Sequence, residues 1–194
     1  MHGLINKSIQ CFLRDTYGAG LWARVAQRAD LDPAGFEAML LYDDALAGQV
    51  LEVAAELLAK PRDCLLEDLG TYLVSHPNLE PVRRLLRFGG ARFADFLHSL
   101  DELPDRARLA VPELDLPRLE LVQIDEATFR LDCERRLPGF EHVLVGLMRT
   151  MADDYGALVI MECLPPDEAL AHVSIRLIDN GFASGRSFEL AAGS

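Results

Sequence analysis

The sequence predicts an α+β fold, in which a helical N-terminal half precedes an antiparallel sheet with one packed helix. In the first ~105 residues apolar side chains recur every three or four positions, the spacing of helices that face a core. After Pro104 short apolar runs between turn residues replace this spacing, and one further helical stretch follows near 139–155. We therefore expect a single domain over 1–194, with a helical subdomain (1–105) and an α/β subdomain (106–194).

Glycine, proline and capping residues separate the expected helices of the N-terminal half. Gly18-Ala19-Gly20 interrupts the first helical pattern, and Asp43 can cap the start of a long helix. Pro61 suits the first turn of the helix that follows. The helices are expected at 3–16, around Trp22, from Asp32-Pro33, from Asp43, from Pro61 to about His76, at 79–88 and at 92–104.

The last of these helices ends in a proline. Its apolar stripe consists of Phe93, Phe96, Leu97, Leu100 and Leu103, and Pro104 continues the same face. Proline lacks a backbone donor and disfavours helical geometry in the residue before it. We therefore expect this helix to end or bend within a residue or two of Leu103.

The C-terminal half alternates strands with one helix. Pro138-Gly139 opens the helix near 139–155, whose apolar residues share one face. Two turn segments, Asp125-Glu126-Ala127 and Pro165-Pro166-Asp167, join pairs of strands. The strands are expected at 119–124, 128–133, 157–163, 172–178 and 182–190.

Composition excludes several classes of function. The formal net charge is −12, and anionic nucleic acids or membranes require clustered Lys and Arg. The four cysteines lie far apart and form no C-x-x-C pair, so a zinc site is not expected. No apolar run approaches the ~20 residues of a membrane span, and the N-terminus lacks a secretory signal pattern. We expect a soluble cytoplasmic protein. It carries no phosphate loop and no nucleophile–base set, so an enzyme is not expected.

Four stretches of the sequence resemble the H-NOX family of haem nitric oxide/oxygen binding domains. They are Met1-His2-Gly3-Leu4-Ile5-Asn6-Lys7, Leu100-Asp101-Glu102-Leu103, Leu116-Pro117-Arg118-Leu119 and Val143-Leu144-Val145-Gly146-Leu147. The resemblance implies haem b between a helical and an α/β subdomain. The cofactor-contacting positions that it implies are Ile5, Ile9, Leu100, Pro104, Pro117, Arg135, Arg136 and Val143.

Both haem-anchoring signatures of that family are altered here. The slot of the histidine that holds the iron is Pro104, and the Tyr-x-Ser-x-Arg motif becomes the run Leu131-Asp132-Cys133-Glu134-Arg135-Arg136. Arg135 or Arg136 could still bind the propionates, or the pair could be a solvated turn.

Haem iron needs an axial ligand such as His, Cys, Met or Tyr. His76 from the distal side is the first candidate, and His98 after helix distortion is the second. The alternatives are a helix-end residue before Pro77 for His76 and a surface histidine for His98. A buried core thiol is the favoured interpretation of Cys133, and a boundary position is favoured for His142.

The resemblance implies a haem-based nitric oxide sensor that signals to a separate partner, such as a histidine kinase or a cyclic-di-nucleotide enzyme. Because Ile5, Ile9 and Val143 are apolar, the distal side would favour NO over O₂ by the logic of the family. The alternative is a regulator of the same fold without haem. Its pocket would be filled by side chains or by another small apolar ligand, and it would act through protein contacts.

Overall fold

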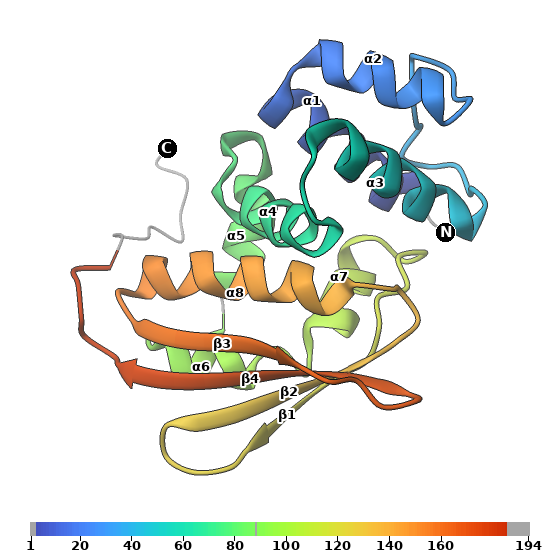
Figure 1. The fold of residues 1–194 in the computed structure, drawn as a ribbon. Coiled ribbons are helices and arrows are strands. Elements are labelled where there is room, and N and C mark those ends of the chain that lie inside the picture. The colour runs from blue at the N-terminus through green and yellow to red at the C-terminus, as the bar shows by residue number, and fades with distance from the viewer. Residues whose placement is uncertain (1–2, 88, 186–194) are drawn as a thin grey trace.

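The computed structural model describes residues 3–87 and 89–185 and confirms the predicted α+β class (Figure 1). The helices are α1 Gly3–Tyr17, α2 Ala19–Arg28, α3 Asp44–Leu58, α4 Arg62–Ser75, the 3-10 turn η1 Pro77–Leu79, α5 Glu80–Arg87, α6 Phe93–His98, α7 Leu103–Ala110 and α8 Phe140–Tyr155. The strands are β1 Leu119–Gln123, β2 Thr128–Glu134, β3 Leu158–Leu164 and β4 Leu170–Asp179.

The strands form one antiparallel sheet in the order β1-β2-β4-β3. Side chains alternate between its two faces, so Phe129, Leu131 and Cys133 of β2 are buried on the inner face. The expected helix α8 packs on that face, alongside β3 (Figure 1). The shorter α6 packs there as well, since Phe96 and Met148 belong to the same buried cluster as the inward side chains of β2.

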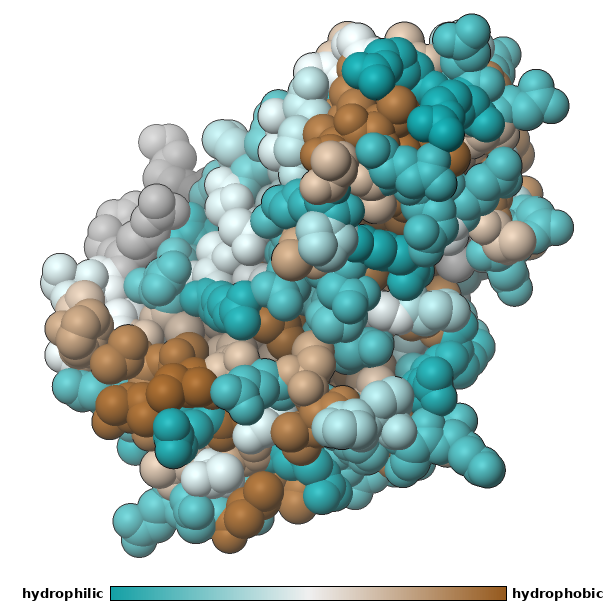
Figure 2. All heavy atoms as spheres, viewed as in Figure 1, coloured by the Kyte–Doolittle hydropathy of each residue, from teal (hydrophilic) through white to brown (hydrophobic). Residues whose placement is uncertain are grey.

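The outer face of the sheet carries exposed apolar side chains where β3 begins and β4 ends. Leu158, Ile160 and Ile178 are each more than a third exposed. Figure 2 shows apolar residues gathered at the lower left of the molecule, over this end of the sheet. None of the described helices is long and apolar enough to cross a lipid bilayer.

Two clusters of buried side chains make up the core, and they meet along α4 and α8. The first lies among α1 to α4 and takes in Val143 of α8. The second joins α5 to α8 with the sheet and takes in Val74 of α4. Phe140, at the start of α8, packs against both clusters. The expected division of the chain at residue 105 stays a prediction.

Two glycines allow α4 and α8 to cross at close range. A Cβ atom at Gly70 would collide with the backbone carbonyl of Val143, and one at Gly146 would collide with the carbonyl of Glu67. Thr71 Oγ1 also donates a hydrogen bond to the Gly146 carbonyl, at 3.4 Å. The crossing therefore fixes how the helical layer sits on α8.

The helix expected over 92–104 is interrupted. α6 ends at His98, residues 99–102 form turns, and Pro104 lies in the first turn of α7. Ser99 accounts for the early end, because its hydroxyl donates to the Phe96 carbonyl at 2.7 Å and its own carbonyl accepts from Arg106 at 2.7 Å. Pro104 starts a helix rather than ending one, since a first-turn residue needs no backbone donor.

Other boundaries differ less. The prediction of a short helix from Asp32-Pro33 is wrong. Asp32 instead makes a turn, in which its carboxylate accepts from the Ala34 amide at 2.8 Å. Asp43 caps α3 as predicted and accepts from the Ala45 amide at 2.8 Å. Of the strand expected at 182–190, residues 182–185 are not a strand, and 186–190 lie outside the described residues.

Candidate functional site

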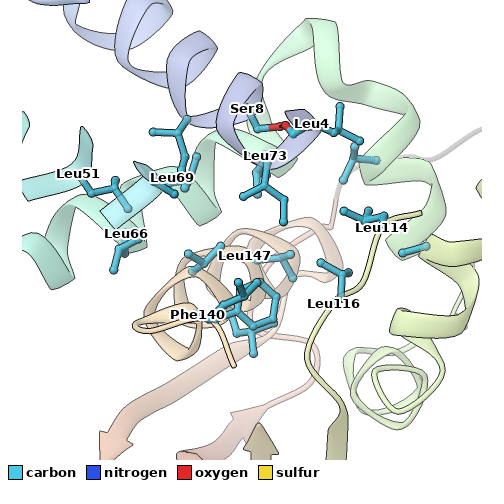
Figure 3. A pocket seen from close by; sticks show the side chains of 18 of the residues that line it. Leu4, Ser8, Leu51, Leu66, Leu69, Leu73, Leu114, Leu116, Phe140 and Leu147 are labelled. Carbon is cyan, nitrogen blue, oxygen red and sulfur yellow. The ribbon is translucent and has the colours of Figure 1, made fainter. Parts of the chain in front are cut away.

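A largely apolar pocket of about 460 Å³ lies where the two buried clusters meet. Its walls come from α1, α3, α4, α5, α7 and α8, from the segment before α8, and from the α7–β1 connector (residues 111–118). Figure 3 shows leucines of these elements around one cavity, with Leu69 and Leu73 of α4 facing Leu147 and Phe140 of α8. A cavity of this size falls in the range of small-molecule sites.

The pocket brings together three residues that the sequence singles out. Ile5 and Ile9 of α1 and Val143 of α8 all line it. Ser8 lines it too, but its hydroxyl donates to the Leu4 carbonyl within the helix at 2.9 Å. The remaining lining is mostly leucine, valine and alanine, so the pocket suits an apolar guest and offers few groups that would orient a polar one.

Arg62 is the basic residue among the described residues that line the pocket. Its Nη2 donates to the Pro138 carbonyl at 3.0 Å, and its Nε lies 3.2 Å from Glu52 Oε1. The guanidinium thus ties the start of α4 to α3 and to the segment before α8. Its charge is already balanced by Glu52.

No histidine, cysteine, methionine or tyrosine is found among the described residues that line the pocket. His76 lies at the end of α4, stacked on Tyr72 at 4.7 Å between ring centroids and 3.8 Å from Asp15. Its Nδ1 accepts from the Asn78 amide at 3.4 Å, so it caps the start of η1. His98 is exposed and touches the edge of Phe129, with 5.9 Å between centroids.

The remaining residues that the resemblance singles out lie elsewhere. Leu100 and Pro117 are buried outside the pocket lining. Pro104 and Arg136 line a separate polar groove of about 580 Å³. Arg136 is paired there with Asp115 of the connector, and Arg135 donates to the Asp167 carbonyl at 2.8 Å.

The cysteines and the other histidines face different surroundings. Cys133 is 1% exposed, as expected of a core thiol, and burial raises its pKa to about 12. Burial, with nearby carboxylates, also raises the pKa of Cys163 to about 11, and this thiol lies 3.6 Å from His142 Nδ1. Among the described residues no cluster of His, Cys, Asp and Glu suits a metal ion.

The residues present therefore do not fit iron-ligated haem. The pocket can take an apolar ring or chain, but its described lining offers no axial ligand. The arginines that would hold propionates are occupied outside it by Asp115 and by a backbone carbonyl.

Sequence reasoning missed most of the pocket wall. Leu66, Leu69 and Leu73 of α4 repeat every three or four residues, and Leu114 and Leu116 of the connector alternate with Asp115. Those spacings were the available signal. They indicate a face that packs against something, but they do not separate a pocket wall from ordinary core.

The fold matches solved structures over nearly the whole chain. A Cs H-NOX mutant carrying 4-cyano-L-phenylalanine superposes with a TM-score of 0.77 and 16% identity, covering 95% of this chain and 100% of that one. A mutant of T. tengcongensis H-NOX also gives a TM-score of 0.77 at 16% identity, covering 93% and 99%.

Curated relatives are much longer proteins. The chain is 23% identical over 160 residues to Soluble guanylate cyclase 89Da of Drosophila melanogaster, which covers 82% of this chain and 24% of that protein. It is 24% identical over 189 residues to Soluble guanylate cyclase gcy-31 of Caenorhabditis elegans, covering 96% and 27%. The chain thus spans about a quarter of the length of these relatives.

The match to a family extends over most of the sequence. Residues 2–163 fit the sequence model of the Haem-NO-binding (HNOB) family. Together with the H-NOX fold of the superposed structures, this shows that the chain belongs to the Haem-NO-binding family.

Proposed function

We propose that this H-NOX domain is a regulatory sensor that takes an apolar molecule into its pocket without ligating haem iron. The observation that carries the proposal is the lining of the pocket, which is almost wholly apolar and, among the described residues, holds no candidate axial ligand. Burial of a guest among leucines supplies affinity in proportion to the apolar area removed from water.

The partner belongs to the same proposal. The curated relatives are named soluble guanylate cyclases, and this chain matches about a quarter of their length. That similarity supports transfer of a signal to a guanylate cyclase or to another signalling enzyme. A guanylate cyclase, a cyclic-di-nucleotide enzyme and a histidine kinase are the candidates, and we propose that pocket occupancy is the signal they receive.

A haem-based nitric oxide sensor is the second candidate, and the family match favours it. For this function the pocket would have to admit the porphyrin, and a ligand such as His76 or His98 would have to reach the iron from outside the present lining. Ile5, Ile9 and Val143 would then form an apolar distal wall.

Absorption spectra of the purified chain separate the two candidates. When haem is titrated into the protein, we expect no Soret band that saturates at one haem per chain. We expect saturable binding when the apolar probe 1-N-phenylnaphthylamine is titrated instead. Stoichiometric haem whose spectrum changes in His76→Ala or His98→Ala would instead establish the second candidate. Failure of the probe to bind would overturn the first.

Substitution of Pro104 adds a sharper test. We expect Pro104→His to remain as free of haem as the control Asp105→His, which places the same side chain one residue further along α7 at an exposed position. A gain of haem in the Pro104 variant alone would show that the family's ligand position still faces a usable haem site, and it would favour the second candidate.

A further inference from the structure

The α7–β1 connector (residues 111–118) separates the apolar pocket from the polar groove. Val111, Leu114 and Leu116 line the pocket from this segment, and Figure 3 shows Leu114 and Leu116 beside the cavity. Leu116 also lines the groove. The side chain of Leu116 thus forms part of the wall between two cavities, of about 460 and 580 Å³.

Asp115 holds this connector from the groove side. Its carboxylate pairs with Arg136, which follows β2, and lies 3.7 Å from Arg108 of α7. Among the described residues Asp115 is the ion-pair partner of Arg136, whereas Arg108 also binds Asp105 at 2.9 Å. The hydrogen bond from Arg136 keeps the pKa of Asp115 below its ordinary value. Ion pairs therefore tie the connector to α7 and to the segment that follows β2.

The other acids of the groove have partners of their own. Asp101 accepts from the Leu121 amide at 2.7 Å, and Glu134 accepts from the Arg118 amide at 3.4 Å. Glu120 lies 3.9 Å from the Arg118 guanidinium. Asp115 is thus the acid whose release would free Arg136 to bind another anion.

We propose that the connector is a displaceable cover and that Asp115 is its latch. An apolar ligand ending in a carboxylate displaces Asp115 from Arg136 and Arg108, so that its apolar part enters the pocket and its carboxylate lies in the groove. This inference rests on the proposed function, because it requires a pocket that binds apolar molecules. It adds the chemical class of the ligand and the contact that keeps the site closed.

The exchange replaces one type of ion pair by another of the same type. One carboxylate replaces another at the same two guanidinium groups, and an exposed ion pair contributes little to stability. Both Arg136 and Asp115 are about half exposed, so the latch can open without a large cost. The half-buried Leu114 and Leu116 can then pack against the guest instead of the pocket wall.

Fluorescence titrations with 1-pyrenedodecanoic acid and its methyl ester test the proposal in the full chain. Asp115→Asn should bind the acid about two- to fivefold more tightly than the parent, the range expected for removing a competing exposed ion pair. The ester should gain less, because it has no carboxylate for the arginines. The acid's advantage in this variant should shrink as salt is added.

Two further variants complete the design. Glu126→Gln removes an exposed carboxylate from the turn between β1 and β2, outside the groove lining, and it should leave both affinities at the parent's values. Arg136→Gln should narrow the difference between acid and ester, because only Arg108 of the two guanidinium groups remains to bind the carboxylate. Metal-free protoporphyrin IX, titrated in parallel, shows whether the planar or the linear member of this ligand class binds more tightly.

The outcomes separate the two proposals. Equal affinities in Asp115→Asn and Glu126→Gln, or an equal gain for acid and ester, would overturn the latch while leaving the apolar pocket in place. If neither probe bound the parent or any variant, the proposed function itself would fail.

Discussion

The carboxylate of Asp132 is a nearly buried charge on the outer face of the sheet. It accepts from Arg130 Nε at 2.7 Å and Nη2 at 2.9 Å, and it lies 2.7 Å from His172 Nδ1. Burial alone would raise its pKa, but the hydrogen bonds from Arg130 and His172 outweigh burial, and the pKa is lowered. This network joins β2 to β4 across a register pair.

Replacing this carboxylate should destabilise the fold. Asp132→Asn should lower the free energy of unfolding at pH 7 by about 1–3 kcal/mol, because the charge-assisted bonds to Arg130 and His172 weaken. A lowered native pKa stabilises the fold above pH ~4, and this contribution is lost as pH falls through the native value. Urea titrations at pH 7 and pH 3.5 should therefore show a smaller gap between parent and variant in acid. A gap that stays constant with pH would contradict this account.

The thiols should differ sharply in reactivity. Cys64 is exposed, whereas burial raises the pKa of Cys133 to about 12 and that of Cys163 to about 11. Because the thiolate is the nucleophile, Cys64 should react first with Ellman's reagent at pH 8. The variant Cys64→Ser should lose the fast phase, while Cys133 should react only after unfolding. A fast phase that survives in the variant and disappears in Cys133→Ser would contradict the burial of that thiol.

At the scale of elements, the crossing of α4 and α8 is the contact most sensitive to small changes. Gly146→Ala should lower the free energy of unfolding by about 1–3 kcal/mol or more, since its methyl group meets the Glu67 carbonyl. Gly48→Ala is the matched control within α3, where an added Cβ meets nothing within 4 Å. It should stabilise by about 0.4–1 kcal/mol, as measured by urea unfolding. Equal effects of the two substitutions would refute the close crossing.

Periodicity predicted the elements better than it predicted their interruptions. The stripe of α8 and the turn residues around β1 and β2 were sufficient, because these signals are local. The end of α6 was not, because it depends on Arg106 reaching back to the Ser99 carbonyl. The stripe from Phe93 to Leu103 continues across this break, so the pattern alone gives one helix where the structure has two.

The candidate site could be predicted only in part. The family resemblance, rather than periodicity, put Ile5, Ile9 and Val143 at one pocket, and all three line it. The pairing of Arg136 with Asp115 could not, since these residues are far apart in sequence and the connector has no periodicity. Whether an arginine faces a pocket or an acid is decided by such nonlocal contacts.

At the scale of the whole molecule, the pocket lies at the junction of two buried clusters, so a guest there touches both. A molecule that binds only the folded state raises its stability with concentration. Elements from both clusters, α1 and α4 from one and α7 and α8 from the other, line the same cavity. A guest there should therefore stabilise the packing of the two clusters against each other.

Filling the pocket from α7 should compete with any guest. Ala107 lines the cavity and is 8% exposed, so Ala107→Leu places added carbons inside it. The added apolar burial should hold or raise the thermal midpoint, at roughly 0.8 kcal/mol per buried CH₂ that fits without strain. Binding of 1-N-phenylnaphthylamine should weaken severalfold. Ala23→Leu, at an exposed position of α2, is the matched control and should change neither quantity. Unchanged probe affinity in a folded Ala107→Leu variant would mean that the probe binds elsewhere, and the pocket would lose its assignment as the ligand site.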